Sequence, residues 1–220
     1  PSGLSVVAEA QAAGRGRRGR QWVSPFAKNL YFSVNWNFQS GMSCIEGLSL
    51  VVGISIAEAL REIGLQDVSV KWPNDIVVAN KKLAGILLEV MGDPTGLCHV
   101  VIGVGLNVYM RAGQISGIDQ EWTALQQLRD LKIKRSEMFV RLMHHLVNNL
   151  KKFERDGFAA FISAWDSYDA YRGQEVCILL GDRVVIGVAS GVSNTGELLV
   201  SNDAGIQSFS SGEVSLRKRW

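Results

Sequence analysis

The sequence predicts an α+β protein with a larger unit, in which strands and helices mix without strict alternation, and a small β-barrel at the C-terminal end. Apolar residues at steps of three and four predict buried helices in the larger unit. From Gln174 onward the chain shows short β-rich pieces separated by turn residues. We therefore expect a boundary near Ala170, which gives units of residues 1–169 and 170–220.

The helices of the larger unit are expected in three places. Apolar residues recur at helical spacing over 43–63, and Gly64 is expected to end that helix. Its remaining positions are also apolar or small, so we expect it to be buried on most sides. Ser136 is expected to cap a second helix whose apolar stripe reaches Phe153, and a third helical stretch is expected over 158–168.

The strands are indicated by short apolar runs bounded by turn residues. Those expected in the larger unit lie at 4–8, 30–36, 68–72, 76–79, 83–90 and 97–108. Pro73 separates two of them, because proline cannot donate a hydrogen bond to a ladder. Those expected in the barrel lie at 175–180, 184–189, 197–200, 206–209 and 214–216.

Composition is that of an ordinary soluble protein. The 220 residues are 47% hydrophobic with a net charge of +2, so the chain lacks the global positive charge of a non-specific polyanion binder. No apolar run is long enough for a transmembrane helix and no signal peptide is visible, so a cytoplasmic location is expected. Cys44, Cys98 and Cys177 are expected to be buried thiols, and no structural metal site is expected. Because the chain begins at Pro1, we expect its first unit to be incomplete.

Residues 14–20 (GRGRRGR) place four arginines and three glycines between two predicted strands. The four cations repel one another, and glycine raises the entropy cost of ordering the segment. We therefore expect a mobile loop that closes over a phosphate or a carboxylate. A solvated basic loop and a nucleic-acid patch are the alternatives for this segment taken alone.

Four segments in order carry a family resemblance: EAQAA at 9–13 leading into the GRGRRGR loop, KWPND at 71–75, KLAGIL at 82–87 and GVGLN at 103–107. This set resembles the biotin protein ligases, and the likeness runs from about Ser5 to Arg217. It implies a mixed β-sheet with helices packed on one face, as in class II synthetases, followed by an SH3-like barrel. It also implies a two-step reaction. Biotin and ATP form biotinyl-5′-AMP with release of pyrophosphate, and a lysine of a biotin carboxyl carrier protein domain, of the acetyl-CoA carboxylase type, then takes the biotin.

The resemblance also implies which residues contact biotin. Gln11 offers the donor and the acceptor that a ureido ring needs, although a backbone-satisfied amide is its alternative. Trp22 is expected to pack on the fused ring, and Lys82 to pair with the carboxylate of biotin and then with the adenylate. The full expected set is Gln11, Gly14, Arg15, Gly16, Arg17, Trp22, Lys82, Gly85, Ile86, Leu87, Gly103 and Gly105.

Nucleotide contacts and catalytic roles follow from the same resemblance. The residues expected at ATP are Arg17, Arg20, Lys71, Asn74, Asn107 and Trp122, and a second loop at 109–117 is expected to order over it. Forming the adenylate brings two anions together, so cations must neutralise the transition state. The expected catalytic residues are Arg15, Arg17, Lys82 and Asp75. Asp75 is expected to orient Lys82 or the incoming amine and to help hold Mg²⁺, with turn capping as its alternative, and Arg18 is assigned to solvent or to holding the loop shut.

Two features of the family pattern are not found in these residues. A Ser-Thr pair that binds the ureido group usually precedes the first strand, so the biotin site is expected to be incomplete. Some members carry an N-terminal winged helix that makes them repressors, with dimerisation through a sheet edge. No recognition helix lies in these residues, so no nucleic-acid binding is predicted for them.

Two other functions compete with biotin ligation. A lipoate or octanoate ligase of the same fold has a substrate without a ureido ring, and Gln11, Trp22 and the short pocket beside Leu87 argue against it. An RNA-binding module would need aromatic residues interleaved with the arginines, and only Trp22 lies near.

Overall fold

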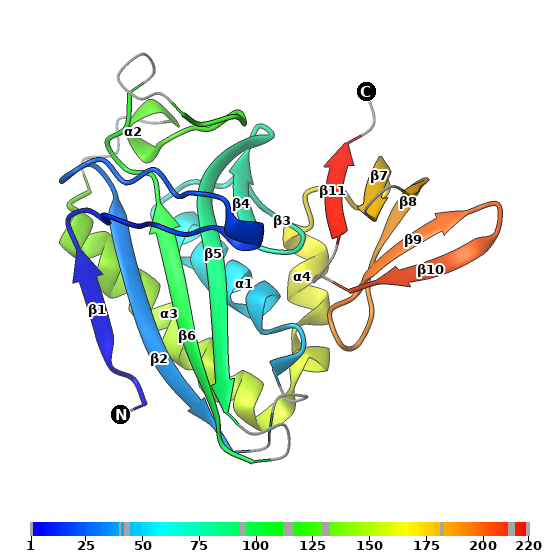
Figure 1. Ribbon diagram of the computed structural model, residues 1–220, viewed down its shortest axis with the longest axis horizontal. Coiled ribbons are helices and arrows are strands. Elements are labelled where there is room, and N and C mark those ends of the chain that lie inside the picture. The colour runs from blue at the N-terminus through cyan, green and yellow to red at the C-terminus, as the bar shows by residue number, and fades with distance from the viewer. Residues whose placement is uncertain are drawn as a thin grey trace.

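The computed structural model describes residues 2–39, 41, 45–92, 96–111, 117–128, 133–180, 183–210 and 214–218. A six-stranded sheet with the order β1-β2-β6-β5-β4-β3 forms the larger unit (Figure 1). Its strands are β1 (Ser5–Ala8), β2 (Leu30–Phe38), β3 (Val68–Lys71), β4 (Asp75–Val78), β5 (Lys81–Gly92) and β6 (Cys98–Leu106). All of the strand regions expected from the sequence are therefore confirmed, with ends shifted by a few residues.

Every pairing between these strands is antiparallel. Among the residues that the structure describes, parallel pairing occurs only at two isolated bridges, Val70 with Asp169 and Lys82 with Trp122. The sheet is thus less mixed than expected, because β3 to β6 follow one another in the chain as a meander of hairpins.

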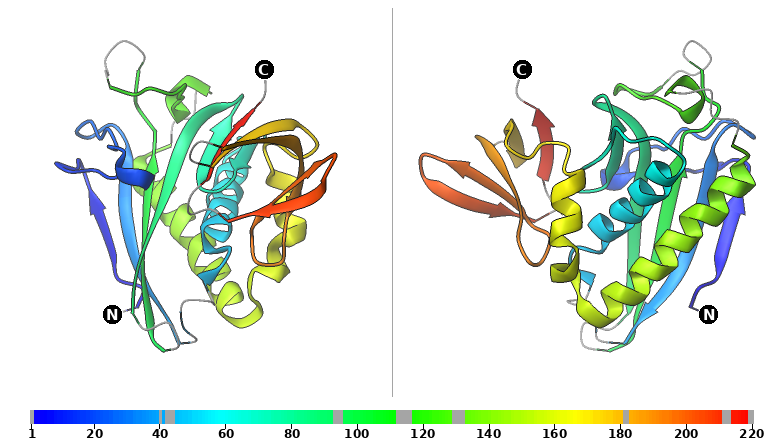
Figure 2. Two further views of the ribbon diagram at one scale, coloured as in Figure 1. Left: turned by 45° about the vertical axis from the view of Figure 1, so that its right-hand side comes forward. Right: turned by 180° about the vertical axis from the view of Figure 1, so that it is seen from behind.

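Helices cover one face of this sheet (Figures 1 and 2). The two long ones are α1 (Leu48–Glu62) and α3 (Arg135–Asp156), which pack against each other, while α1 also contacts β5 and α3 contacts β2. The shorter ones are α2 (Leu125–Leu128), the 3-10 helix η3 (Phe158–Phe161) and α4 (Ile162–Tyr168). As expected, α1 is buried on most sides, with Val51, Val52 and Ile54 fully inaccessible to solvent.

Two helix starts differ from the sequence prediction. Helix α1 begins at Leu48, because Gly47 before it has a left-handed backbone with φ of 78°. The predicted start at Ser43 lies outside the described residues. Helix α3 begins at Arg135 with Lys134 as its N-cap residue, so Ser136 is not the cap. Its buried stripe includes Leu142 and Phe153 as predicted, and it ends at Gly157 with φ of 68°.

The C-terminal unit is a five-stranded antiparallel sheet with the order β10-β9-β8-β7-β11. Its strands are β7 (Glu175–Leu180), β8 (Arg183–Val192), β9 (Leu198–Asn202), β10 (Gly205–Phe209) and β11 (Val214–Lys218), as the turn residues predicted. Trp72 Nε1 donates a 3.1 Å hydrogen bond to the carbonyl of Gly196, and Ala170 N–H donates to Val70. One hydrophobic core runs through both units, and the boundary at Ala170 stays a prediction.

Within the described ranges, no helix is long and apolar enough to cross a membrane. Cys98 and Cys177 are free thiols, and Cys98 is buried as expected, whereas Cys177 is only partly buried. The predicted thiol at Cys44 lies outside the described residues.

Candidate active site

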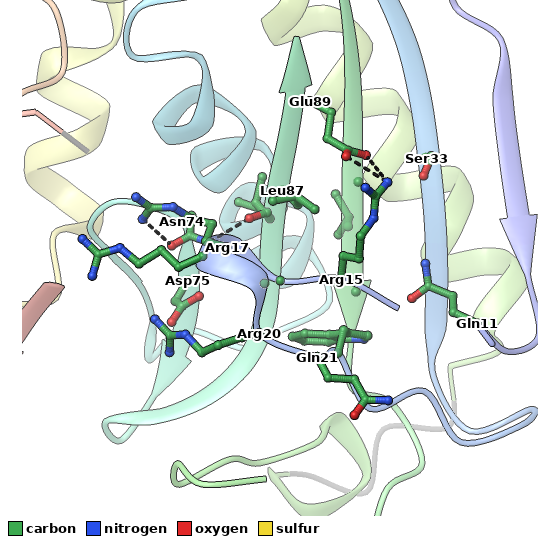
Figure 3. Close-up of a pocket in the computed structure, with 18 of the residues that line it drawn as sticks. Gln11, Arg15, Arg17, Arg20, Gln21, Ser33, Asn74, Asp75, Leu87 and Glu89 are labelled. Carbon is green, nitrogen blue, oxygen red and sulfur yellow. Dashed lines mark hydrogen bonds and ion pairs between the residues drawn. The ribbon is translucent and has the colours of Figure 1, made fainter. Parts of the chain in front are cut away.

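A cleft of about 280 Å³ lies on the face of the six-stranded sheet that the helices leave open (Figure 3). The predicted site residues that line it are Gln11, Arg15, Gly16, Arg17, Arg20, Trp22, Asn74, Asp75, Lys82, Gly85, Ile86, Leu87, Gly103 and Gly105. Segments that are far apart in the sequence of the larger unit therefore meet at one place, as the resemblance implied.

The floor of the cleft consists of rows of residues paired across strands. Strand alternation sends every second residue of β6 into the core, so Val101, Gly103 and Gly105 face the cleft. Gly105 pairs with Gly85 of β5, Gly103 pairs with Leu87, and Val101 pairs with Glu89. On its other side Gly103 pairs with Ser33 of β2. The middle row, Ser33-Gly103-Leu87, carries no charge, and its central glycine leaves the floor open.

The arginine-rich segment forms a hairpin with backbone hydrogen bonds of its own, and its expected mobility without a ligand stays a prediction. Gly16 N–H donates to the Arg20 carbonyl at 2.7 Å, and Trp22 N–H donates to the Gly14 carbonyl at 2.9 Å. Arg15 and Gln21 form an antiparallel bridge between these two bonds. Residues 14–22 are called the Arg/Gly hairpin below. Its backbone hydrogen bonds order the segment despite the repulsion among its side chains, and they occupy the N–H of Gly16, a residue of the expected biotin set.

Two arginines tie the Arg/Gly hairpin to the sheet on opposite sides of the cleft (Figure 3). Arg15 Nη2 lies 2.9 Å from one carboxylate oxygen of Glu89 and 3.0 Å from the other. Arg17 Nη1 donates to Asn74 Oδ1 at 3.3 Å, and Asn74 Nδ2 in turn donates to the Ile86 carbonyl at 2.8 Å. The Arg/Gly hairpin therefore crosses the cleft floor between two fixed points.

Trp22 packs directly on two of the floor glycines. A Cβ atom built on Gly105 would lie 2.5 Å from the Trp22 indole, and one built on Gly85 would lie 2.9 Å from it. Gly105 therefore makes room for Trp22, whereas the sequence had assigned that room to the ligand. At Gly103 a Cβ would have no neighbour closer than 3.4 Å, so the floor is open there, and its contact with a ligand stays a prediction.

This packing predicts different results for two glycine-to-alanine variants. Gly105→Ala should lower the free energy of unfolding by about 1–3 kcal/mol, because the new methyl group overlaps the Trp22 ring. Gly103→Ala should change it much less. Urea denaturation of both variants provides the measurement, and equal losses would contradict the packing role of Gly105.

Lys82 and Asp75 form the charged pair nearest to the indole. Lys82 Nζ lies 2.7 Å from Asp75 Oδ1, an ion pair without good hydrogen-bond geometry, and both side chains are mostly buried at 15% and 17% exposure. The ammonium also lies 5.3 Å from the centre of the Trp22 ring, within cation–π range. The backbone of Lys82 is fixed by hydrogen bonds with Glu121 and Thr123. Its ammonium is thus held at the cleft wall by the strand and by two side chains.

Arg17 is the most constrained of the cleft arginines. Burial, and then the neighbouring charge of Arg18, lowers the pKa of the Arg17 guanidinium, while Asp75 opposes that change. Arg20 adds a smaller repulsion. A guanidinium that has lost water and faces other cations gains from an anion more than a solvated one does. This end of the cleft is therefore suited to a negatively charged ligand.

Four predicted site residues do not line the cleft. Gly14 is buried beneath Trp22, where a Cβ would lie 2.6 Å from the Trp22 carbonyl. Asn107 is 4% exposed and donates to the Thr123 carbonyl at 3.0 Å, so its amide holds the chain beside β5. Lys71 lies 5.6 Å from the Tyr171 ring, toward the C-terminal unit. Trp122 is bridged to Lys82 through its backbone, and residues 112–116 of the predicted second loop lie outside the described part.

Several cleft residues were not predicted, and Glu89 and Ser33 matter most. The others include Ala13, Arg18, Gln21, Phe32, Val101, Val104 and Gln120. Glu89 could have been found by continuing the strand alternation from Gly85 through Leu87. Ser33 could not, because its place depends on the register between β2 and β6.

The cleft has few carboxylates that could coordinate a metal ion. Among the described residues, no group of three or more His, Cys, Asp and Glu side chains has an arrangement that could hold a metal ion. Of the two cleft carboxylates, Asp75 faces Lys82 and Glu89 faces Arg15. These carboxylates would suit a Mg²⁺ ion that is coordinated mainly by phosphate oxygens of a bound nucleotide, with Asp75 as its one protein carboxylate.

Comparisons with known proteins agree with this geometry. Residues 1–107 match the profile of the biotin/lipoate A/B protein ligase family, and residues 172–217 match that of the biotin protein ligase C terminal domain. The bifunctional ligase/repressor BirA of Escherichia coli is 41% identical over 98% of this chain and 67% of its own length. The biotin–[acetyl-CoA-carboxylase] ligase of Paracoccus denitrificans is 30% identical over 95% of this chain and 88% of its own length.

Among solved structures, the biotin protein ligase from Aquifex aeolicus in complex with biotin and ATP is similar over the whole length. It has a TM-score of 0.86 and 35% identity, and the likeness covers 100% of this chain and 90% of that one. The four sequence segments, the two-unit fold and these relatives lead to one conclusion. The chain belongs to the biotin protein ligase family and is a ligase.

Proposed function

We propose that this chain activates biotin with ATP as biotinyl-5′-AMP and then transfers biotin to a lysine of a biotin carboxyl carrier protein domain. The observation that carries the proposal is the separation of charge along the cleft. Arg17, Arg20 and Asp75 lie on one side, near Asn74 (Figure 3). The middle of the floor is uncharged. A molecule with one neutral cyclic end and one carboxylate fits such a cleft in a single direction.

The first step needs the positively charged side chains on the Arg17 side of the cleft. A carboxylate oxygen of biotin attacks the α-phosphorus of ATP, a new O–P bond forms, and pyrophosphate leaves with the electron pair of the broken bond. Arg17 and Lys82 neutralise the charge that gathers between the two reacting anions. Arg20 is the exposed cation for the nucleotide phosphates. Any Mg²⁺ supplied with ATP would add positive charge at the phosphates, with Asp75 as its protein carboxylate.

The second step needs a neutral amine. The lysine of the carrier attacks the carbonyl carbon of the mixed anhydride, and AMP leaves as its C–O bond breaks. Asp75 is placed to accept hydrogen bonds from the incoming amine, because it already faces an ammonium group on Lys82. We assign it that orienting role.

At the neutral end, Gln11 and Ser33 offer polar groups to the ureido ring. Gln11 is tied through its backbone, because its N–H donates to Ser24 Oγ at 2.9 Å, which leaves its side-chain amide for the ligand. Nucleotide roles for Lys71, Asn107 and Trp122 stay predictions, as do the carrier and the homodimer. Because Lys71, Asn107 and Trp122 do not line the cleft, its geometry does not support a nucleotide role for them.

The test is to incubate the chain with ATP, Mg²⁺ and either biotin or lipoate, and to look for the acyl-adenylate by mass spectrometry. Biotinyl-5′-AMP with biotin alone is the expected result. An adenylate only with lipoate would replace the proposal with the alternative enzyme of the same fold. Absence of both products from a folded chain would refute it.

A further inference from the structure

The Arg/Gly hairpin is anchored on the floor of the cleft at two separate rows. Trp22 covers the first row, Gly85 with Gly105. Arg15 reaches Glu89, which belongs to the third row and pairs with Val101. Residues two apart on one strand are about 7 Å apart, so these two contacts are separated by about 13 Å along β5.

The row between the two contacts is the uncharged one. Leu87 lies between Gly85 and Glu89 on the same face of β5, and it pairs with Gly103. Trp22 and Arg15 belong to the same hairpin, because Trp22 N–H is bonded to the Gly14 carbonyl and Arg15 is bridged to Gln21. The Arg/Gly hairpin therefore contacts the floor on either side of the middle row, through the Trp22 ring on one side and the Arg15 side chain on the other.

We propose that Glu89 is a positioning residue, which holds the Arg/Gly hairpin over the middle row by binding the Arg15 side chain. The inference rests on the proposed function, in which the neutral part of biotin occupies that row. It gives Arg15 the role of an anchor in place of the catalytic cation that the sequence suggested.

The charges on the two sides of the cleft support this division of roles. The positive charge of Arg15 is already balanced by a carboxylate within 3.0 Å. An anionic group that approached Arg15 would also approach Glu89 and be repelled by it. On the other side, the Arg17 guanidinium donates to the neutral amide of Asn74 and lies near Arg18 and Arg20, whose repulsion Asp75 partly opposes. The attraction for an anion is therefore concentrated on the Arg17 side, and the Arg15 contact can persist when a ligand binds.

The variant Glu89→Gln keeps the shape of the side chain and removes its charge. If Glu89 anchors the Arg/Gly hairpin, biotinyl-5′-AMP should dissociate about two- to fivefold faster, the range for an exposed ion pair. Without any ligand, hydrogen exchange at the amides of Gly16 and Trp22 should rise by a similar factor. If Glu89 instead competes with the ligand for a catalytic Arg15, the same variant should bind biotin more tightly, and that result would overturn the proposal.

Two further variants distinguish a positioning role of Glu89 from a non-specific effect of losing a surface charge. Glu62→Gln is the matched control, because Glu62 is exposed to a similar degree, 44% against 41%, and pairs with Arg141 far from the cleft. It should leave dissociation and hairpin exchange unchanged. The charge swap Arg15→Glu with Glu89→Arg should restore part of what Arg15→Glu alone loses, because an anchor needs only opposite charges. A swap as impaired as Arg15→Glu alone would show that Arg15 acts on the ligand.

The hydrogen-exchange measurement also tests the anchoring role of Glu89 independently of the proposed function. If the wild-type chain forms no biotinyl-5′-AMP, the proposed function fails, but exchange in the ligand-free chain still tests the anchor. Unchanged exchange in Glu89→Gln would refute the anchor even where the wild-type chain forms adenylate at a normal rate.

Discussion

Lys82→Met is expected to slow adenylate formation by about 10- to 100-fold, because it removes a charge-assisted contact worth about 1.5–3 kcal/mol to a charged ligand. The Met side chain keeps much of the length and the contact with Trp22, so the walls of the cleft should stay in place. The measurement is single-turnover formation of biotinyl-5′-AMP. Calorimetry with biotin should show weaker binding in parallel.

The structure changes what the same variant should do to stability. Lys82 is the ion-pair partner of Asp75, which is only 17% exposed, so removing the ammonium leaves a carboxylate that has little contact with water and has lost its ion-pair partner. We expect a loss of about 1–3 kcal/mol in the free energy of unfolding. A lysine that is merely solvated would have changed it by no more than about 0.5 kcal/mol.

A double variant separates the two effects of Lys82. Asp75→Asn together with Lys82→Met removes the stranded charge, so stability should largely return while adenylate formation stays slow. Lys81→Met is the matched control, since Lys81 is the neighbouring residue of β5 and is exposed. Normal adenylate formation by Lys82→Met would remove Lys82 from the mechanism and leave the segment as a wall of the cleft.

The sequence was most informative where local pattern decides the structure. Apolar runs predicted strands over 83–90 and 97–108, which β5 and β6 confirm, and the cleft lies on the face that Gly85, Leu87 and Gly103 share. Turn residues and apolar runs placed the strands of both units to within a few residues. These features depend on backbone geometry that each segment carries by itself.

Predictions that depended on distant partners were weaker. Asn107 was assigned to nucleotide, and that role stays a prediction; in the structure its amide donates to the carbonyl of Thr123, which lies in a segment that periodicity did not assign to any element. The mobility of residues 14–20 was predicted from the repulsion among their own arginines, whereas the partner of Arg15, Glu89, lies 74 residues further along the chain. No count of charges within a segment can reveal a partner that only the folded sheet brings near.

Arg17→Ala is expected to lower the rate of adenylate formation about 10- to 100-fold while the fold survives. The reason is electrostatic: burial and Arg18 both disfavour the charged guanidinium of Arg17, which an anion between the two reacting groups relieves. Removing the Arg17 guanidinium takes away electrostatic stabilisation at the place where negative charge concentrates in the transition state. The loss of the 3.3 Å bond to Asn74 should be small by comparison, because Asn74 keeps its bond to the Ile86 carbonyl.

Three measurements decide the role of Arg17. Single-turnover adenylation of Arg17→Ala gives the size of the loss, and Arg17→Lys should recover part of it if charge matters more than the planar shape. Arg155→Ala removes an arginine whose partner is its neighbour Asp156, far from the cleft, and should adenylate biotin normally. An unchanged adenylation rate in Arg17→Ala would leave Lys82 as the chief cation of the step. The partial burial of Arg17 beside Arg18 and Arg20 would then need another explanation, because taking a cation out of water next to other cations costs the fold free energy.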